Sequence, residues 1–179
     1  MTTRHIHRLA ARPHRLIAEA LQGLIVSELL APGRRLLITS PWISDVPVLD
    51  NRGGRFSVLD TTWGANVIRL SAILRTLLQQ QTTVYLHSGR GPRETDFIER
   101  LTEAARRDGT SPRLHTRQST HDPDKVLDHE KAIAGDDWIV HGSMNLTYRG
   151  VEINGELVTV STEPAHVAAI TTELMSLFA

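Results

Sequence analysis

Residues 129–145 read HEKAIAGDDWIVHGSMN, in which two short apolar runs flank a Gly-Asp-Asp turn. This pattern predicts a β-hairpin with strands at 131–134 and 138–141. Side chains two residues apart on a strand point to the same face. His129 and Lys131 should therefore project side by side into one pocket where the hairpin begins.

Upstream of this hairpin, helical and strand patterns alternate along the chain. Apolar residues recur at helical spacing in three segments, at 12–31, 66–79 and 93–107. Short runs typical of strands lie between or after these segments, at 36–39, 83–86 and 113–116. A βαβαβ order of this kind predicts a largely parallel core sheet.

The segment after the hairpin adds a strand at 156–161 and a last helix that begins at Pro164. Together the elements predict an α/β fold with a mixed sheet and helices on both faces, an αβα sandwich. No linker or repeat divides the sequence, so we expect residues 1–179 to form a single domain. Residues 41–62 are the least regular part and are expected to form a functional or mobile loop.

Composition limits the class of protein. Twenty basic residues balance twenty acidic ones, and no cysteine is present, which excludes a disulfide framework and thiolate chemistry. The zero net charge argues against strong non-specific binding to nucleic acid, although the arginine-rich residues 1–35 leave a local basic face open. No apolar run is long enough to span a membrane and no secretory signal is visible, so we expect a soluble, cytoplasmic protein.

The polar side chains of the hairpin segment have the chemistry needed to cleave a phosphate ester. The Lys131 ammonium can hold the anionic oxygens while the His129 imidazole attacks phosphorus. Ser143 and Asn145 follow Gly142 at the end of the second strand and can donate hydrogen bonds to the same oxygens. We therefore expect His129 and Lys131 to be catalytic. Lys131, Ser143 and Asn145 form the expected phosphate-binding set.

Two carboxylates accompany these residues. Glu156, at the start of the next strand, could accept a proton from an imidazole nitrogen and fix the tautomer of His129, so it is a third candidate catalytic residue. Asp136 lies in the turn and is assigned a supporting role; the alternative is that it only stabilises the turn, as aspartate often does. No carboxylate cluster with magnesium spacing accompanies the motif, so we expect no metal and no cofactor.

These residues resemble the signature of the phospholipase D superfamily, which is His-x-Lys, four residues, Asp, then Gly-Ser-x-Asn and a later acidic residue. The corresponding segments here are HEKAIAGD, GSMN and NGE, within residues 129–156. One residue fewer than in the family pattern separates Asp136 from Gly142, which makes the role of Asp136 the least defined. The resemblance implies the phospholipase D-type fold, with which the upstream βαβαβ pattern agrees.

The superfamily usually has two such motifs per active site, whereas this chain has one. In this respect it is similar to small single-motif bacterial nucleases, which implies a homodimer that shares one site across a twofold axis. Residues 41–52, PWISDVPVLDNR, together with the hairpin are also similar to phospholipase D-like proteins of bacterial clusters that place 7-deazaguanine derivatives in DNA. That similarity implies DNA as the bound nucleic acid, a role in DNA modification or phage defence, and other proteins of such a system as partners.

The resulting hypothesis is a metal-independent phosphodiesterase, a DNA endonuclease that forms a phosphohistidine on His129. Two alternatives stay open. A phospholipid or other small phosphodiester could be the substrate, although the polar residues 50–57 do not suggest a membrane-facing entrance. The domain could also be a non-catalytic nucleic-acid-binding subunit of a defence complex, with its motif used to dock a phosphate.

Three further features have two interpretations each. Trp42 and Trp63 flank the irregular segment and could stack on bases or pack in the core. Arg52 and Arg55 could grip a phosphate backbone or lie in a solvated loop. A His-x-His pair begins at His5, near the terminus, where disorder is expected rather than a metal site.

Overall fold

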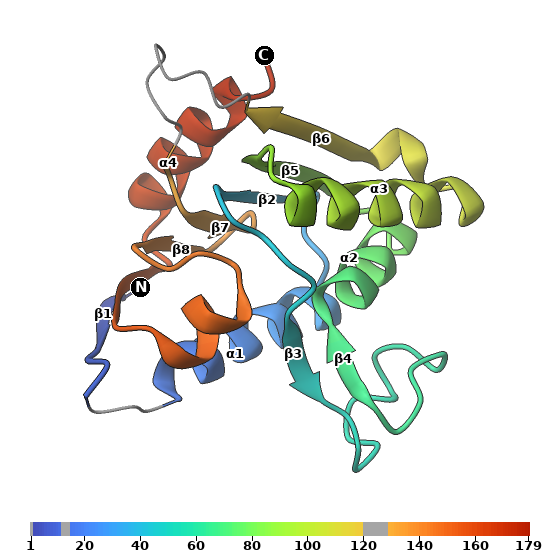
Figure 1. Cartoon of the computed structure of the whole chain (residues 1–179), viewed down its shortest axis with the longest axis horizontal. Helices are drawn as coiled ribbons and strands as arrows, with labels where there is room; N and C mark the ends of the chain where they lie inside the picture. Colours follow the sequence, from blue (N-terminus) through green and yellow to red (C-terminus); the bar gives the residue numbers. More distant parts are fainter. Residues whose placement is uncertain (1, 12–14, 120–128) are drawn as a thin grey trace.

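The computed structural model describes residues 2–11, 15–119 and 129–179. Its centre is a seven-stranded sheet with the order β1-β9-β8-β7-β2-β5-β6 (Figure 1). The strands are β1 Thr3–Arg8, β2 Arg35–Ser40, β5 Thr83–Gly89, β6 Leu114–Ser119, β7 Ala132–Ala134, β8 Ile139–Gly142 and β9 Glu156–Ser161. β2, β5 and β6 are parallel, and every other pairing in this sheet is antiparallel. The predicted α/β mixed sheet is therefore confirmed.

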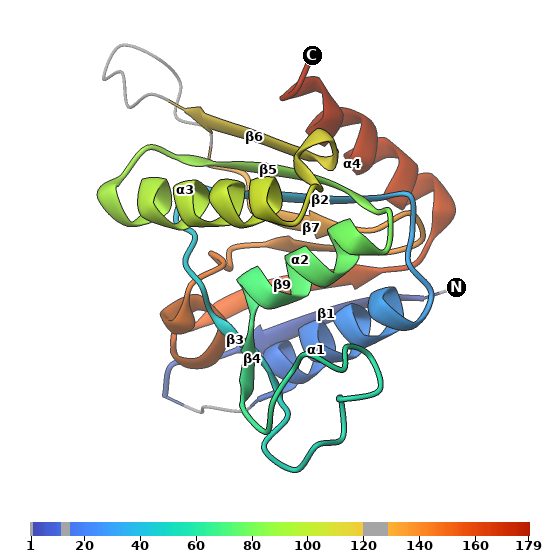
Figure 2. The same ribbon diagram turned by 90° about the vertical axis from the view of Figure 1, so that its right-hand side faces the viewer.

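Helices cover both faces of this sheet (Figure 2). One face is covered by α1 Leu16–Leu30, α2 Leu70–Gln79 and α3 Pro92–Arg107, and the other by α4 Pro164–Ser176. Alternation along β2 produces this arrangement, because Leu36 and Ile38 pack with the first group while Leu37 packs against α4. Among the helices of the described ranges, none is both long enough and apolar enough to cross a lipid bilayer.

The N-terminal segment is more regular than its sequence suggests. β1 pairs along its whole length with β9, and His5 Nδ1 lies 3.0 Å from Thr159 Oγ1. The expected disorder at His5 is therefore wrong. The sequence pattern misses this strand because β1 is an edge strand in which only Ile6 and Arg8 are buried, so its apolar alternation is too short to recognise.

The irregular region also contains regular structure. β3 Pro47–Asp50 pairs with β4 Val67–Arg69 in a separate, two-stranded antiparallel sheet. Because β4 occupies Val67–Arg69, the helix predicted from residue 66 begins at Leu70. The helix predicted from residue 12 begins at Leu16, and residues 12–14 lie outside the described ranges.

A buried carboxylate joins α1 to the hairpin formed by β7 and β8. Trp138 Nε1 donates to Glu28 Oε2 at 2.8 Å, and the Gly33 N–H donates to Glu28 Oε1 at 2.8 Å. Each carboxylate oxygen thus has the partner that a desolvated polar group requires. Glu28 therefore fixes the hairpin against the turn that leads from α1 into β2.

Asp136 fixes the same end of the hairpin against the start of β2. Its Oδ2 accepts a hydrogen bond from the Arg34 N–H at 2.8 Å, and its carboxylate pairs with the guanidinium groups of Arg34 and Arg35. These contacts lie beyond the last residue of β7, whereas His129 precedes the first. The structure therefore places Asp136 apart from His129, in a turn-stabilising position.

Removing the Asp136 carboxylate should destabilise the fold and leave the chemistry of the site intact. In Asp136→Ala the Arg34 N–H loses its acceptor and two guanidinium groups lose a counter-charge, at a cost of about 1–3 kcal/mol in the free energy of unfolding. Urea unfolding measures the loss, with Asp137→Ala at the exposed neighbouring position as the control. Unchanged stability together with lost turnover would instead give Asp136 a chemical role.

Candidate active site

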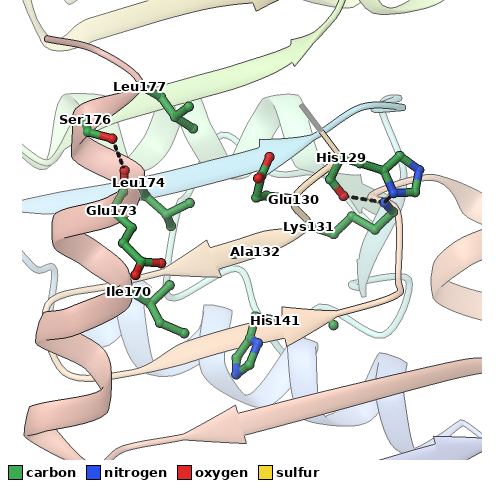
Figure 3. Close-up of a pocket in the computed structure, with 11 residues that line it drawn as sticks. His129, Glu130, Lys131, Ala132, His141, Ile170, Glu173, Leu174, Ser176 and Leu177 are labelled. Atoms are coloured by element: carbon green, nitrogen blue, oxygen red, sulfur yellow. Dashed lines mark hydrogen bonds between the residues drawn. The ribbon is translucent and has the colours of Figure 1, made fainter. Parts of the chain in front are cut away.

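His129 and Lys131 lie together at the start of β7 (Figure 3). Lys131 Nζ is 2.9 Å from His129 Nδ1 and donates to the His129 carbonyl oxygen at 2.7 Å. Lys131 is only 7% exposed, whereas His129 is exposed. A charged ammonium can only donate, so a neutral imidazole accepts at Nδ1 and carries its proton on Nε2. The two residues predicted to act together are thus in contact.

The charge of Lys131 depends on its neighbours. Burial lowers the pKa of the Lys131 ammonium, because a charged group loses solvation inside a protein. The negative charges of Glu156 and Glu130 act in the opposite direction and favour the protonated form. Glu156 is itself buried at the start of β9. The site therefore holds a partly desolvated cation that nearby carboxylates help to keep protonated.

Ser143 joins the loop after β8 to the start of β9. Its hydroxyl donates a short hydrogen bond to Glu156 Oε2 and accepts one from the Leu157 N–H at 3.0 Å. Gly142 has a φ of 148°, and a side chain there would meet the Leu157 carbonyl oxygen, so this close approach requires glycine. In the described part of the chain Glu156 thus bonds to Ser143 rather than to His129. The predicted roles of Glu156 toward the imidazole and of Ser143 toward phosphate stay predictions.

Ser40, at the carboxyl end of β2, holds the second half of this loop. Its hydroxyl accepts from the Leu146 N–H at 3.0 Å and donates to the Trp42 carbonyl at 2.7 Å. Asn145 Oδ1 lies 3.5 Å from the same hydroxyl, so the amide is oriented beside the end of the sheet. Sequence reasoning missed Ser40. The available signal was a polar residue at the carboxyl end of a buried parallel strand, where sites of open α/β sheets gather.

Arg8 is a second residue that sequence reasoning missed. Its side chain is completely buried and donates to the carbonyl oxygens of Gly150, Val151 and Asn154, at 2.5, 2.5 and 2.7 Å respectively. These carbonyls belong to a short π-helix, Arg149–Ile153, and to the residue that follows it. A buried guanidinium with three backbone acceptors fixes the path of the chain into β9.

Trp42 lies against the candidate nucleophile. The centroids of the Trp42 and His129 rings are 5.8 Å apart, and the ring planes meet at 86°. Trp42 is 51% exposed, whereas Trp63 is buried in the main core. Core packing is therefore the correct interpretation for Trp63 and the wrong one for Trp42.

A cavity of about 420 Å³ adjoins the His129–Lys131 pair and extends towards α4 (Figure 3). Ile170 and Leu174 contribute to its apolar wall, and Glu173 lies on the same side. His141 also lines the cavity, and its buried Nε2 has no hydrogen-bond partner. Burial lowers the pKa of His141, which favours its neutral form, and this imidazole lines the same cavity as Lys131.

Two arginines of the irregular segment, Arg52 and Arg55, were candidates for binding a phosphate backbone, and no metal site was expected. Arg52 pairs with Asp50, with 2.5 Å between Nη2 and Oδ2, so its guanidinium already has a carboxylate partner. Arg55 is exposed. Within residues 2–11, 15–119 and 129–179, no group of three or more His, Asp or Glu side chains is arranged to hold a metal ion.

No protein-family model matches the sequence, and no curated protein matches it. Solved structures do match the fold. Nuc from Salmonella typhimurium, a phospholipase D family member, has a TM-score of 0.60 at 10% identity, over 98% of this chain and 92% of Nuc. NucT from Helicobacter pylori has a TM-score of 0.57 at 10% identity, over 99% and 96% of the two chains. Phosphatidylserine synthase from Haemophilus influenzae has 0.59 at 17% identity, over 96% of this chain and 37% of that enzyme. The chain thus has the phospholipase D-type fold.

Neutralising Glu156 should make Lys131 lose its proton at lower pH. The amide in Glu156→Gln can still accept from Ser143 but carries no charge, so burial lowers the pKa of Lys131 with less opposition. Lys125 and Lys131 are the only lysines of the sequence, so an NMR titration of ¹³C-labelled lysine follows both, with Lys131→Arg for assignment. The predicted result is a lower pKa for Lys131 in Glu156→Gln than in the wild type.

Glu130→Gln is the matched control, because Glu130 acts on Lys131 in the same direction but less strongly. Binding of a phosphodiester should be lost at high pH, since only the protonated amine of Lys131 attracts the phosphate. In Glu156→Gln this loss should occur at a lower pH than in the wild type. A Lys131 pKa that is unchanged or higher in Glu156→Gln would contradict this account of the site.

Proposed function

We propose that this chain is a metal-independent phosphodiesterase that cleaves DNA through a phosphohistidine on His129 and acts as a homodimer. The observation that carries the proposal is the contact between the Lys131 ammonium and the His129 imidazole. Folding stability does not explain a buried cation beside an exposed imidazole, because burial disfavours the charged form. It suits a phosphate ester, whose anionic oxygens replace the lost solvation while the imidazole attacks.

In the proposed first step, the phosphate oxygens draw the Lys131 ammonium away from His129 Nδ1. The ring proton then moves to Nδ1, and Nε2 attacks phosphorus to form a P–N bond. The P–O bond to the leaving strand breaks, and His129 of the partner subunit, in its doubly protonated form, gives a proton to the leaving oxygen and becomes neutral. Water next attacks phosphorus and gives a proton to the partner's His129, and the P–N bond breaks to release a phosphomonoester.

The supporting residues have linked roles in this scheme. Lys131 and Asn145, doubled by the twofold axis, hold the non-bridging oxygens as charge develops. For Ser143 to join them, its hydroxyl must turn away from Glu156. That movement releases the Glu156 carboxylate, which can then accept a hydrogen bond from the Nδ1–H of His129 and fix the tautomer that attacks.

DNA is the proposed substrate because the motif region resembles single-motif nucleases and proteins of DNA-modification clusters. A role in phage defence, with other proteins of such a system as partners, follows from the same resemblance. The zero net charge argues against strong binding of DNA by this chain alone, so a partner protein would contribute to binding the DNA backbone.

Phospholipid cleavage is the second candidate function. It is favoured by the fold similarity to phosphatidylserine synthase and by the apolar wall that Ile170 and Leu174 give the cavity. A third candidate, from another class, is a subunit that docks a phosphate of nucleic acid without cleaving it. Cleavage and binding assays with DNA and with phospholipid vesicles separate the three.

Replacing the nucleophile should abolish cleavage while the fold survives. His129→Ala is expected to lose roughly a thousandfold or more in turnover of labelled single- and double-stranded DNA, because no P–N bond can form. His129→Asn should still bind DNA, since the phosphate-binding residues remain. Wild-type cleavage should persist in EDTA, because Lys131 and Asn145 stabilise the charge. His115→Ala, which removes an exposed histidine stacked on Tyr85, is the control.

Cleavage of phosphatidylcholine vesicles but of no DNA would select the lipid candidate. Binding of DNA without cleavage, unchanged in His129→Ala, would select the docking candidate. Loss of activity in EDTA with recovery on addition of a divalent metal would refute the proposed mechanism.

If two chains share one active site, a His129→Ala chain should inactivate the wild-type chain with which it pairs. A mixed dimer has one His129, and the scheme needs two. After subunit exchange with a ninefold excess of His129→Ala, the activity per wild-type chain should fall to about one tenth, because about one tenth of wild-type chains then pair with each other. The same mixture assayed before exchange is the control. Full activity in a monomeric fraction, or after exchange, would exclude the shared site.

A further inference from the structure

Trp42 is an exposed aromatic residue that core packing does not explain. The chain has three tryptophans, and the other two are buried, Trp63 at 7% and Trp138 at 6% exposure. Trp42 is 51% exposed. An indole left in water forgoes the burial that stabilises most tryptophans. Its surface is therefore available to a ligand.

The backbone that carries Trp42 is fixed on both sides. The Trp42 carbonyl oxygen accepts from Ser40 Oγ at 2.7 Å. The next residue, Ile43, is fully buried and forms a bridge to Leu146, and the Ser44 N–H donates to the Leu146 carbonyl at 3.0 Å. Little backbone freedom remains to be lost when a ligand contacts the indole, which favours binding to a preformed surface.

The ring geometry leaves part of the indole uncovered next to the reacting group. The Trp42 and His129 planes are nearly perpendicular, so whichever ring presents its edge, the imidazole covers at most one face of the indole. The centroids are 5.8 Å apart. A planar group stacked on the free face would therefore lie within one nucleotide of a phosphate that His129 attacks.

We propose that the free face of Trp42 stacks on an unpaired nucleobase of the nucleotide next to the scissile phosphate. This inference rests on the proposed nuclease function and names its substrate class, which is single-stranded or locally unpaired nucleic acid. Every base has an aromatic face, so such a contact binds a strand without selecting its sequence. In a duplex the same base is paired and stacked, and it must leave the helix before it can reach the indole.

Two substitutions distinguish the effect of an aromatic ring at residue 42 from the effect of side-chain size. In the His129→Asn background, where DNA stays intact, Trp42→Leu should weaken binding of a single-stranded oligonucleotide roughly tenfold, because stacking is lost. Trp42→Phe keeps an aromatic face and should remain within about threefold of the parent. Tyr148→Leu, which removes another exposed ring, is the matched control and should bind as the parent does.

An abasic oligonucleotide of the same length tests whether a base is the group recognised. It offers phosphates without bases, so it should bind more weakly than the normal strand and equally well to the parent, Trp42→Leu and Trp42→Phe. Quenching of tryptophan fluorescence by the normal strand should exceed that by the abasic strand, and the excess should vanish in Trp42→Phe. The opposite result, with Trp42→Leu binding normal and abasic strands as the parent does, would overturn the inference.

The cleavage assay distinguishes failure of this inference from failure of the proposed function. This assay uses enzyme that retains His129. If that enzyme and its Trp42→Leu variant both cut single strands, duplexes and abasic strands equally, the nuclease function is supported and the stacking role of Trp42 is refuted. If the wild type cuts none of them, the proposed function falls as well. A Trp42→Leu variant that loses binding to phosphatidylglycerol vesicles but keeps its DNA affinity would assign the indole to a membrane surface and overturn the inference.

Discussion

A buried ammonium at the start of β7 is the constraint on which the arrangement of the site depends. Lys131 is 7% exposed, and its amine bonds to the carbonyl and Nδ1 of His129. The Lys131 side chain can be buried because the strand that follows it, β7, lies inside the sheet between β2 and β8. The position of β7 is in turn fixed at its far end by Glu28 and Asp136. The contacts that fix the hairpin and the candidate catalytic pair thus lie at opposite ends of one short strand.

Local patterns were sufficient to predict much of this fold. The hairpin, the parallel βαβαβ part and the strand at 156–161 each have a signal within a few residues, and the structure confirms them. The predicted contact between His129 and Lys131 is present, but both residues precede β7, which begins at Ala132, so strand alternation does not account for it. The turn-stabilising position of Asp136 was one of two interpretations that the sequence allowed, and its three contacts with the start of β2 favour it.

Long-range contacts account for what the sequence did not predict. Ser40 reaches Leu146 across 106 residues, and Arg8 reaches Gly150 across 142. No local pattern encodes such partners, because each is chosen by the sheet order. The edge strand β1 also has its partner, β9, far along the chain, and with two buried residues it has too little apolar alternation to give a local signal. The link between Ser143 and Glu156 likewise depends on the close approach of two strands, and it gives both residues a partner other than the expected one.

In the proposed mechanism, hydrolysis proceeds through two displacements at phosphorus, the first by His129. The stereochemical course of cleavage distinguishes two displacements from one, and it does not depend on how long the intermediate survives. A DNA strand with one phosphorothioate linkage of defined configuration would be cleaved in ¹⁸O-labelled water, and the configuration of the product determined. Two in-line displacements predict retention of configuration at phosphorus. Inversion would show that water attacks directly, and it would contradict a phosphohistidine on His129.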